Sequence, residues 1–181
     1  NVNGYSLPPP TKPSLFEIAN LSKGINSING DVRNYSDFVK AVKRILPEIV
    51  FHLAAQPLVL ESYKNPVETY STNILGTLNV LEALRYNYSV KAIINFTTDK
   101  CYENKERAHG YSENDRLGGI DPYSSSKACS ELVTHAYRES FYKNEKNQAG
   151  IATVRAGNVI GGGDWARNRL IPDCIKAFSE K

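Results

Sequence analysis

Apolar residues in this chain alternate between a helical spacing and short uninterrupted runs. Between residues 37 and 46 they recur at helical spacing, and Pro47 ends the helix that this spacing predicts. Residues 49–53 follow as a short apolar run, which is typical of a strand buried on both faces. The two patterns then repeat, which predicts further helices over 67–86 and 121–141 and further strands over 92–96 and 151–154.

This alternation of strands and helices predicts an α/β fold with a doubly wound parallel sheet. A further strand is expected near residues 2–5. Parallel sheets of this kind bind their ligands beyond the carboxyl ends of the strands. We therefore look for the chemistry of the protein in the residues that directly follow each predicted strand.

Two unusual stretches follow the predicted strands over 49–53 and 92–96. Residues 53–57 read Leu-Ala-Ala-Gln-Pro, and their small side chains would let a flat or charged ligand approach the backbone. Residues 97–100 read Thr-Thr-Asp-Lys, which places an acid beside a base and suits proton transfer in both directions. Each stretch has a plainer explanation. The first would also serve as a tight strand-to-helix turn, and the second as a polar loop capped by Asp99.

The predicted helix over 121–141 begins with a pair of residues that suits acid–base chemistry. Asp121 is a good N-cap and Pro122 a good first helical residue. Tyr123 and Lys127 then lie four positions apart, so both side chains project from one face of the helix. A nearby ammonium favours the phenolate and lowers the pKa of a tyrosine. Such a phenol could remove a proton from a sugar alcohol, although the same spacing also arises by chance on exposed helices.

The last stretch, 155–165, follows the strand over 151–154. It contains three consecutive glycines, Gly161–Gly163, between Asn158 and Trp165, the one tryptophan of the chain. A diphosphate or a sugar could lie against such bare backbone. A simple glycine hinge is the alternative.

Composition and charge narrow the class of protein. The 181 residues are 41% hydrophobic and 23% charged, as in a soluble globular protein. The net charge of +3 comes from scattered residues, so no surface for nucleic acid is expected. No apolar run is long enough for a membrane span. Cys101, Cys129 and Cys174 lie far apart without metal-ligand spacing, so we expect reduced cysteines, no metal site and a cytoplasmic protein.

Six runs together carry a resemblance to a known family: 52–59, 70–77, 98–104, 118–127, 155–165 and 169–173. The chain resembles the extended short-chain dehydrogenase/reductase family, whose members have a Rossmann fold and a Tyr-x-x-x-Lys motif. Within that family it is similar to the sugar-nucleotide 4,6-dehydratases that act on CDP-glucose. The resemblance implies an NAD cofactor, a small-molecule sugar nucleotide (CDP-glucose) as substrate, and a hydro-lyase reaction.

The resemblance also assigns residues to the two ligands. The cofactor would be held by residues from four stretches: Asp31 and Val32 at the adenine end, Leu53, Ala54, Ala55 and Thr72 along the diphosphate and ribose, and Tyr123 and Lys127 at the nicotinamide end. The substrate would be bound by Gln56, Thr98, Asn158, Arg169 and Leu170.

In the reaction that the resemblance implies, Tyr123 takes the proton of the C4 hydroxyl while hydride passes from C4 to NAD, and Thr98 binds the C4 oxygen. Water then leaves from C6 with Asp99 as proton donor, and the hydride returns to C6. Lys100 stands where the dTDP-glucose dehydratases carry Glu. Our hypothesis is that Lys100 takes the C5 proton or stabilises the enolate. The alternative is that Lys100 only pairs with Asp99 or a substrate phosphate.

Two features predict that the sequence is a fragment, truncated at both ends. No methionine is present, and the glycine-rich phosphate loop of a first Rossmann βα unit is absent. We expect residues 1–155 to be a partial NAD-binding domain and 156–181 to begin the sugar-nucleotide-binding region. Such a fragment would bind NAD poorly and be inactive alone. The full-length protein would form a homodimer through the helices over 67–86 and 123–141.

Three rival functions stay open at this point. A dTDP-glucose 4,6-dehydratase would fit, but Lys100 argues against it. A sugar-nucleotide 4-epimerase would use Thr98, Tyr123 and Lys127 without needing an acid at Asp99. A non-catalytic NAD-binding protein predicts a broken motif, whereas these four residues are all present.

Overall fold

The computed structural model describes residues 1–143 and 149–180, which divide into two compact units. The first unit comprises 1–31 and 158–181, and the second comprises 32–157. The first contains β1 (Asn3–Ser6), α1 (Leu15–Ile18), η1 (Leu21–Lys23), β2 (Asn26–Asn29) and α7 (Leu170–Ser179). The second contains α2 (Tyr35–Ile45), β3 (Ile49–His52), α3 (Val59–Lys64), α4 (Pro66–Tyr70), η2 (Ser71–Leu75), α5 (Gly76–Arg85), β4 (Ala92–Thr98), η3 (Asp99–Cys101), α6 (Pro122–Tyr137), η4 (Arg138–Tyr142) and β5 (Gly150–Ala156).

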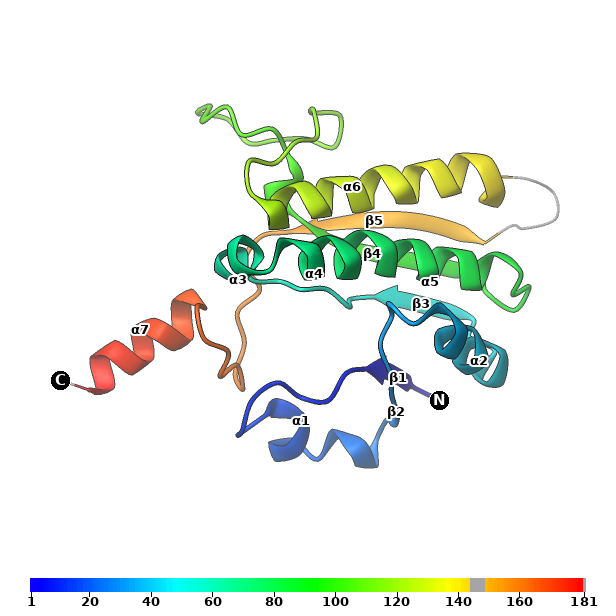
Figure 1. The fold of residues 1–181 in the computed structure, drawn as a ribbon, viewed down its shortest axis with the longest axis horizontal. Coiled ribbons are helices and arrows are strands. Elements are labelled where there is room, and N and C mark those ends of the chain that lie inside the picture. The colour runs from blue at the N-terminus through cyan, green and yellow to red at the C-terminus, as the bar shows by residue number, and fades with distance from the viewer. Residues whose placement is uncertain (144–148, 181) are drawn as a thin grey trace. The chain divides into compact units, whose positions relative to one another are not determined.

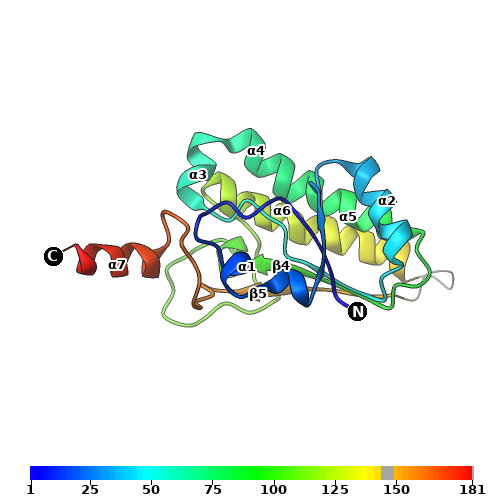
Figure 2. The ribbon, with the colours of Figure 1, turned by 90° about the horizontal axis from the view of Figure 1, so that it is seen from below.

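The second unit is built on a parallel sheet with β4 between β3 and β5. Ile49 of β3 pairs with Ala92 of β4, which pairs with Gly150 of β5, so the three strands start in register. The helices α5 and α6 lie together on one face of this sheet (Figures 1 and 2). All three strands therefore end at the same edge, at the amino-terminal end of α6.

The core of this unit lies between the sheet and these helices. Val80, Leu81 and Leu84 of α5 are almost completely buried, as is Ile93 of β4. Each such side chain contributes roughly 1.5–3 kcal/mol when it leaves water. Because α5 packs against α6 and α6 packs against β4, the adjoining strand ends have a closely packed support.

Helix α6 begins where the sequence predicts it, for local reasons. The Asp121 carboxylate accepts the backbone N–H of Ser124 at 2.9 Å, and Pro122 occupies the first turn. Just before this cap, the backbone of Gly119 lies against the first turn. A Cβ at position 119 would come within 2.4 Å of the Ser125 nitrogen, so glycine is required there.

The helix predicted over 67–86 is present, but it is not regular. It runs through α4, η2 and α5, and η2 is a single π-helical turn. Inserted turns of this kind often occur at functional sites in helical proteins. Here the turn contains Thr72 and the buried Asn73.

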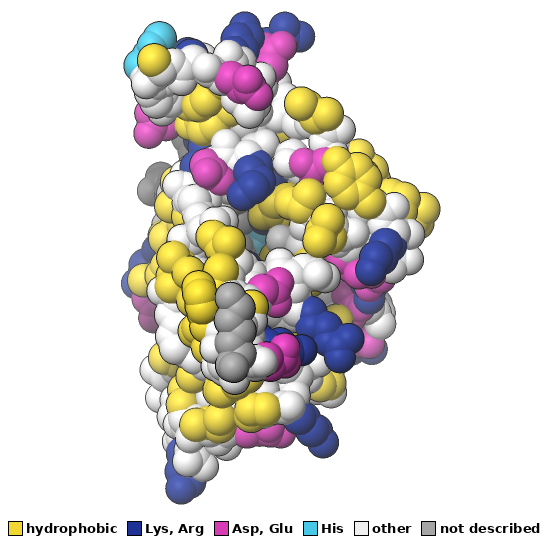
Figure 3. Space-filling model, turned by 90° about the vertical axis from the view of Figure 1, so that its left-hand side faces the viewer, with side chains coloured by type: hydrophobic (Ala, Val, Ile, Leu, Met, Phe, Trp, Pro, Cys, Tyr) yellow, Lys and Arg dark blue, Asp and Glu magenta, His cyan; other side chains and the backbone are white. Residues whose placement is uncertain are grey.

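The first unit contains a parallel pair of strands. Asn3 of β1 pairs with Asn26 of β2, and α1 and η1 connect the two. Helix α7 leaves Leu170, Ile175 and Phe178 exposed. Figure 3 views the chain from the α7 end and shows hydrophobic side chains lying open between charged ones on this face.

The structure confirms the predicted class, with parallel sheets and flanking helices, but corrects one detail. The run 49–53 was expected to be buried on both faces. In β3, however, Ile49 and Phe51 are 57% and 58% exposed, because they point away from the face that α5 and α6 cover. The three cysteines are free, as expected. Within 1–143 and 149–180 no helix has both the length and the apolar character needed to cross a membrane.

Candidate active site

Three polar residues lie where β4 ends at the edge of the sheet. Thr98 ends the strand, and its hydroxyl donates to Asp99 Oδ1 at 3.0 Å and accepts the Lys100 backbone N–H at 3.4 Å. The Lys100 ammonium lies 3.9 Å from Asp99 Oδ1. Thr98 is buried, whereas the side chains of Asp99 and Lys100 are 58% and 44% exposed. An acid and a base therefore face solvent from one short 3₁₀ turn.

The first turns of α6 provide a tyrosine and a lysine that are both buried. Tyr123 and Lys127 are 9% and 6% exposed. The Lys127 ammonium donates to the carbonyl oxygen of Phe96 in β4 at 2.8 Å. Burial lowers the pKa of Lys127 to about 8, against a weaker opposing effect of Glu131. Lys127 therefore loses its proton more readily than an exposed lysine, and its ammonium is hydrogen-bonded to the strand that carries Thr98.

Packing brings these two groups together with the end of β5. The turn η3 packs against α6, so the Thr98–Asp99–Lys100 turn borders the helix of Tyr123 and Lys127. Gly157 directly follows β5, and a Cβ at that position would lie 3.6 Å from Asp99 Oδ2. The carboxyl ends of β4 and β5 and the start of α6 therefore surround one small region.

Hydrogen bonds link the turn of small residues after β3 to α6. Asn73 of η2 accepts the backbone N–H of Gln56 at 2.8 Å and donates to the hydroxyl of Ser126 in α6 at 2.8 Å. The Gln56 side chain donates to the Thr69 hydroxyl and accepts the Leu58 backbone N–H. Asn73 and Ser126 are fully buried, so they hold the turn against α6 without facing solvent.

Beneath the site, His52 at the end of β3 is buried among hydroxyl groups. Its Nε2 lies 3.0 Å from the Thr77 hydroxyl, which lies 3.0 Å from the Ser130 hydroxyl of α6. Burial, helped by the nearby Lys127 charge, lowers the pKa of His52 to about 4. The imidazole is therefore neutral at neutral pH and acts as a structural partner of Thr77.

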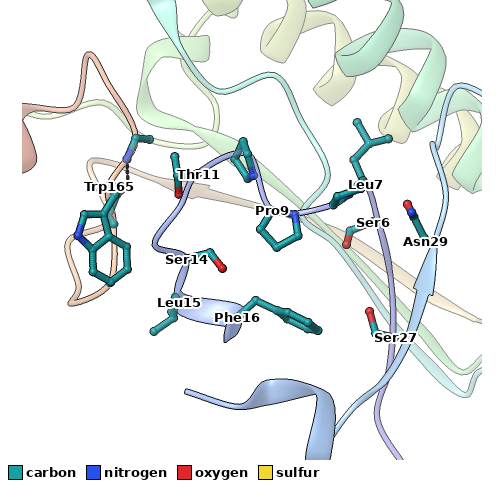
Figure 4. Close-up of a pocket in the computed structure, with 15 residues that line it drawn as sticks. Ser6, Leu7, Pro9, Thr11, Ser14, Leu15, Phe16, Ser27, Asn29 and Trp165 are labelled. Carbon is teal, nitrogen blue, oxygen red and sulfur yellow. Dashed lines mark hydrogen bonds between the residues drawn. The ribbon is translucent and has the colours of Figure 1, made fainter. Parts of the chain in front are cut away.

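A separate cavity of about 560 Å³ lies in the first unit (Figure 4). Ser6 and Asn29, which end β1 and β2, line it together with Ser27. Leu15 and Trp165 lie at the opposite side in Figure 4. Its position beyond the carboxyl ends of two parallel strands is the place where such sheets bind ligands.

In the structure, only some of the site residues predicted from the sequence lie close together. Thr98, Asp99, Lys100, Tyr123 and Lys127 meet at one edge of the second unit, and the turn containing Leu53, Ala54, Ala55 and Gln56, together with Thr72, flanks the same helix. Val32 is buried in the second unit. Asp31, Asn158, Arg169 and Leu170 belong to the first unit. The predicted roles of all these residues stay predictions.

Two residues at the site had no role in the sequence analysis. Glu131 lies one helical turn beyond Lys127, is buried, and forms an ion pair of 3.0 Å with Arg155 of β5. Burial alone would raise the pKa of the Glu131 carboxyl, but hydrogen bonds from Arg155, Thr97 and Thr153 outweigh it and lower the pKa. The only sequence signal was the spacing Tyr123, Lys127, Glu131, which places the three on one helix face.

The described part of the chain offers no group of three His, Cys, Asp or Glu side chains that could hold a metal ion.

Comparisons with known proteins agree with this geometry. The chain is 52% identical over 180 residues to CDP-glucose 4,6-dehydratase of Salmonella typhimurium, covering 98% of this chain and 50% of that protein. It superimposes with a TM-score of 0.81 on the UDP-glucuronic acid 4-epimerase of Bacillus cereus, at 24% identity, covering 99% of this chain and 55% of that one. The dTDP-glucose 4,6-dehydratase of Streptomyces venezuelae gives a TM-score of 0.78 at 23% identity, with 90% and 49% covered.

The two structural likenesses concern the fold, and the chain spans about half the length of these relatives. A family model described as GDP-mannose 4,6 dehydratase matches residues 14–149, which include the Thr98 turn and the Tyr123–Lys127 pair. The chain therefore belongs to the GDP-mannose 4,6 dehydratase family.

Proposed function

We propose that the protein carrying this chain is a sugar-nucleotide 4,6-dehydratase that converts CDP-glucose to CDP-4-keto-6-deoxyglucose. The observation that carries the proposal is the packing of the Thr98–Asp99–Lys100 turn against the helix of Tyr123 and Lys127. The 52% identity to a CDP-glucose 4,6-dehydratase supports the reaction and the choice of nucleotide. An epimerase would need the Tyr–Lys pair but no acid at Asp99.

The residues at this edge fit an NAD cofactor, which two of the related structures contain. Ala54, Ala55 and Gly157 leave bare backbone at the ends of β3 and β5, where a flat ring can approach. The Lys127 ammonium has three donors, and Phe96 O accepts one of them, so donors remain for ribose hydroxyls. Asp31 and Val32 would hold the adenine end. When bound, NAD would accept a hydride from the sugar and return it.

In the first half of the reaction, Tyr123 takes the proton of the C4 hydroxyl. Lys127 supports it, because an ammonium nearby favours the phenolate. Thr98 binds the C4 oxygen as it becomes a ketone. All three side chains are buried, so water competes little for them.

In the second half, the C4 ketone acidifies the C5 hydrogen. We assign the removal of this proton to the Lys100 amine, which forms when its ammonium passes a proton to Asp99. Asp99 then protonates the departing C6 hydroxyl, so that one water leaves. Lys100 returns its proton to C5 as hydride comes back to C6, and both groups recover their starting charges. The 3.9 Å between the Lys100 ammonium and Asp99 also supports the alternative, in which Lys100 only pairs with the acid. A Lys100→Glu variant with full activity would exclude a specific role for the ammonium.

The test is to express the protein from its complete gene and to incubate it with NAD and one sugar nucleotide at a time. CDP-glucose, dTDP-glucose, UDP-glucose and GDP-mannose form the four arms, and NMR detects the 4-keto-6-deoxy sugar. We expect product from CDP-glucose in clear excess. Product from another arm alone would overturn the nucleotide assignment. Inversion at C4 without loss of water would identify an epimerase.

Three further assignments accompany this function. We propose a homodimer formed through α4, α5 and α6, because Val67, Leu75 and Leu132 leave apolar surface on that side of the unit. Light scattering after gel filtration would test it.

We also propose a cytoplasmic location. Residues 1–155 would serve as an NAD-binding region and 156–181 would begin the sugar-nucleotide-binding region.

A further inference from the structure

Six side chains of the second unit form one continuous column of carboxylates, guanidiniums and phenol rings. We call it the stacked column. In order it comprises Glu131, Arg155, Tyr102, Tyr111, Arg107 and Asp115.

The centre of the stacked column is a pair of rings between two cations. The rings of Tyr102 and Tyr111 are stacked, with centroids 5.1 Å apart and planes inclined by 18°. The Arg155 guanidinium lies 4.8 Å from the centroid of Tyr102, and the Arg107 guanidinium lies 4.1 Å from that of Tyr111. A guanidinium over a phenol ring is attracted to the electron-rich face of the ring.

Both ends of the column are closed by a carboxylate that accepts two hydrogen bonds. Arg155 donates Nε and Nη2 to the two oxygens of Glu131 at 3.1 and 3.0 Å. Arg107 donates Nη1 to Asp115 at 2.9 Å and Nη2 to its other oxygen. The hydrogen bond from Arg107 lowers the pKa of Asp115, so that end is ionised at neutral pH. Bidentate pairs of this kind fix direction as well as distance.

The inner end of the column holds the turn η3 at both of its ends. Upstream, Glu131 accepts the hydroxyl of Thr97, the residue before Thr98. Downstream, Arg155 donates Nη1 to the Tyr102 hydroxyl at 2.9 Å, and Tyr102 directly follows η3. The Glu131–Arg155 ion pair thus contacts the chain on both sides of η3, the turn that carries Asp99 and Lys100.

The outer end of the column orders the loop between Tyr102 and α6. Tyr102 bridges to Leu117 as the chain returns, and the Asp115 carboxylate accepts the backbone N–H of Ser112 at 2.6 Å. The stack therefore joins the far part of this loop to Tyr102, and through Tyr102 to Arg155.

We infer that the stacked column is a positioning device for the dehydration half of the reaction. It holds Asp99 and Lys100 at a fixed place beside the Tyr123–Lys127 face of α6, and its outer members act only through Tyr102. What Asp99 and Lys100 do chemically rests on the proposed function. A displacement of the turn should therefore slow the loss of water. C4 oxidation should continue, because Tyr123 and Lys127 stand on α6 and Thr98 is held by the pairing of β4 with β5.

The experiment compares two matched substitutions in the same loop of the protein expressed from its complete gene. Arg107→Leu removes the outer cation of the column. Arg116→Leu removes an exposed cation that pairs with Glu103 at 3.7 Å and stands outside the column. Both remove one positive charge and add the same side chain.

We expect Arg107→Leu to lower the rate of product formation by roughly 10- to 100-fold, with little change in KM. The absorbance of reduced NAD should rise during turnover, because oxidation continues while dehydration lags. Arg116→Leu should behave as the unmodified protein. Equal effects of the two substitutions, or an equal slowing of both halves of the reaction, would overturn the inference.

Hydrogen exchange provides a readout that needs no substrate or cofactor. In the Arg107→Leu variant, backbone amides of residues 98–103 should exchange roughly tenfold faster or more, because the contacts on both sides of η3 are loosened. Arg116→Leu should leave them unchanged. If the unmodified protein makes no keto sugar from any of the four sugar nucleotides, the proposed function fails. The exchange result still shows whether the stacked column holds η3 in place. Unchanged exchange of these amides in both variants would refute the positioning role of the stacked column, whether or not the proposed function holds.

Discussion

The two halves of the candidate site are built in opposite ways. Tyr123 and Lys127 stand on a capped helix of 16 residues and are 9% and 6% exposed. Asp99 and Lys100 stand on a 3₁₀ turn of three residues, with side chains 58% and 44% exposed. The first pair is fixed by the packing of its helix, and the second by a network of polar and aromatic contacts around its turn.

The difference matches what each half would have to do. A tyrosine that works near neutral pH needs a nearby cation in a dry place, and burial has moved the pKa of Lys127 to about 8 for that purpose. Proton transfer to a departing hydroxyl needs groups that reach the substrate. Asp99 and Lys100 can reach it, and their placement depends on Thr97, Tyr102 and the ion pair described above.

The largest expected effect comes from the buried half. Tyr123→Phe removes the hydroxyl that takes the C4 proton, so both product and reduced NAD should fall by roughly 10³-fold. Tyr137→Phe on the same helix is the control, because that hydroxyl donates to Glu82 at 3.0 Å and not to the site. A Tyr123→Phe variant that still forms reduced NAD at the normal rate would show that another group takes the proton.

The exposed half should respond differently. Asp99→Asn keeps the shape of the turn but removes the proton donor, so product formation should fall by roughly 10²-fold. C4 oxidation should persist, and reduced NAD should accumulate on the enzyme, as followed by absorbance and by NMR of the sugar. Loss of both halves together would mean that the two halves of the site are not separable.

This contrast also explains which parts of the molecule could be predicted from the sequence. The strand over 92–96 and the helix over 121–141 were predicted because apolar spacing and the Asp121–Pro122 start are local signals, and β4 and α6 confirm them. The strand β2 was missed, since its sequence Asn-Ser-Ile-Asn carries little apolar pattern and depends on pairing with β1.

At the site, the strand-end rule placed Thr98 and Asp99 correctly at the end of β4. It could not reveal the ion pair of Glu131 with Arg155, because partners 24 residues apart meet only through the register of β5 on β4. The ring stack of Tyr102 and Tyr111 was equally hidden, since it depends on how the loop returns to Leu117.

A smaller effect should appear in stability and tests how dry the buried half is. The pKa of His52 is about 4 in the folded protein and near 6.5 when unfolded, so the unfolded chain binds more protons between these values. Stability is therefore complete above pH 6.5 and falls as the pH drops towards 4, by about 3 kcal/mol in all. Urea unfolding at pH 7 and pH 5 should show about 2 kcal/mol of this loss. In His52→Gln the corresponding loss should be absent, and an unchanged loss would assign it to other groups.

The smallest effect concerns the charge on Lys127. Because burial brings its pKa to about 8, the ammonium is present below that pH and is lost above it, so kcat/KM should fall by about tenfold per pH unit on the alkaline side. Lys127→Arg keeps a charge that does not titrate in this range. The variant should be slower overall, because the larger planar guanidinium does not fit the buried place from which the ammonium donates to Phe96 O, but its alkaline limb should begin about one pH unit higher or more. Alkaline limbs that coincide in the two proteins would mean that Lys127 acts by position alone and that another group sets the upper pH limit.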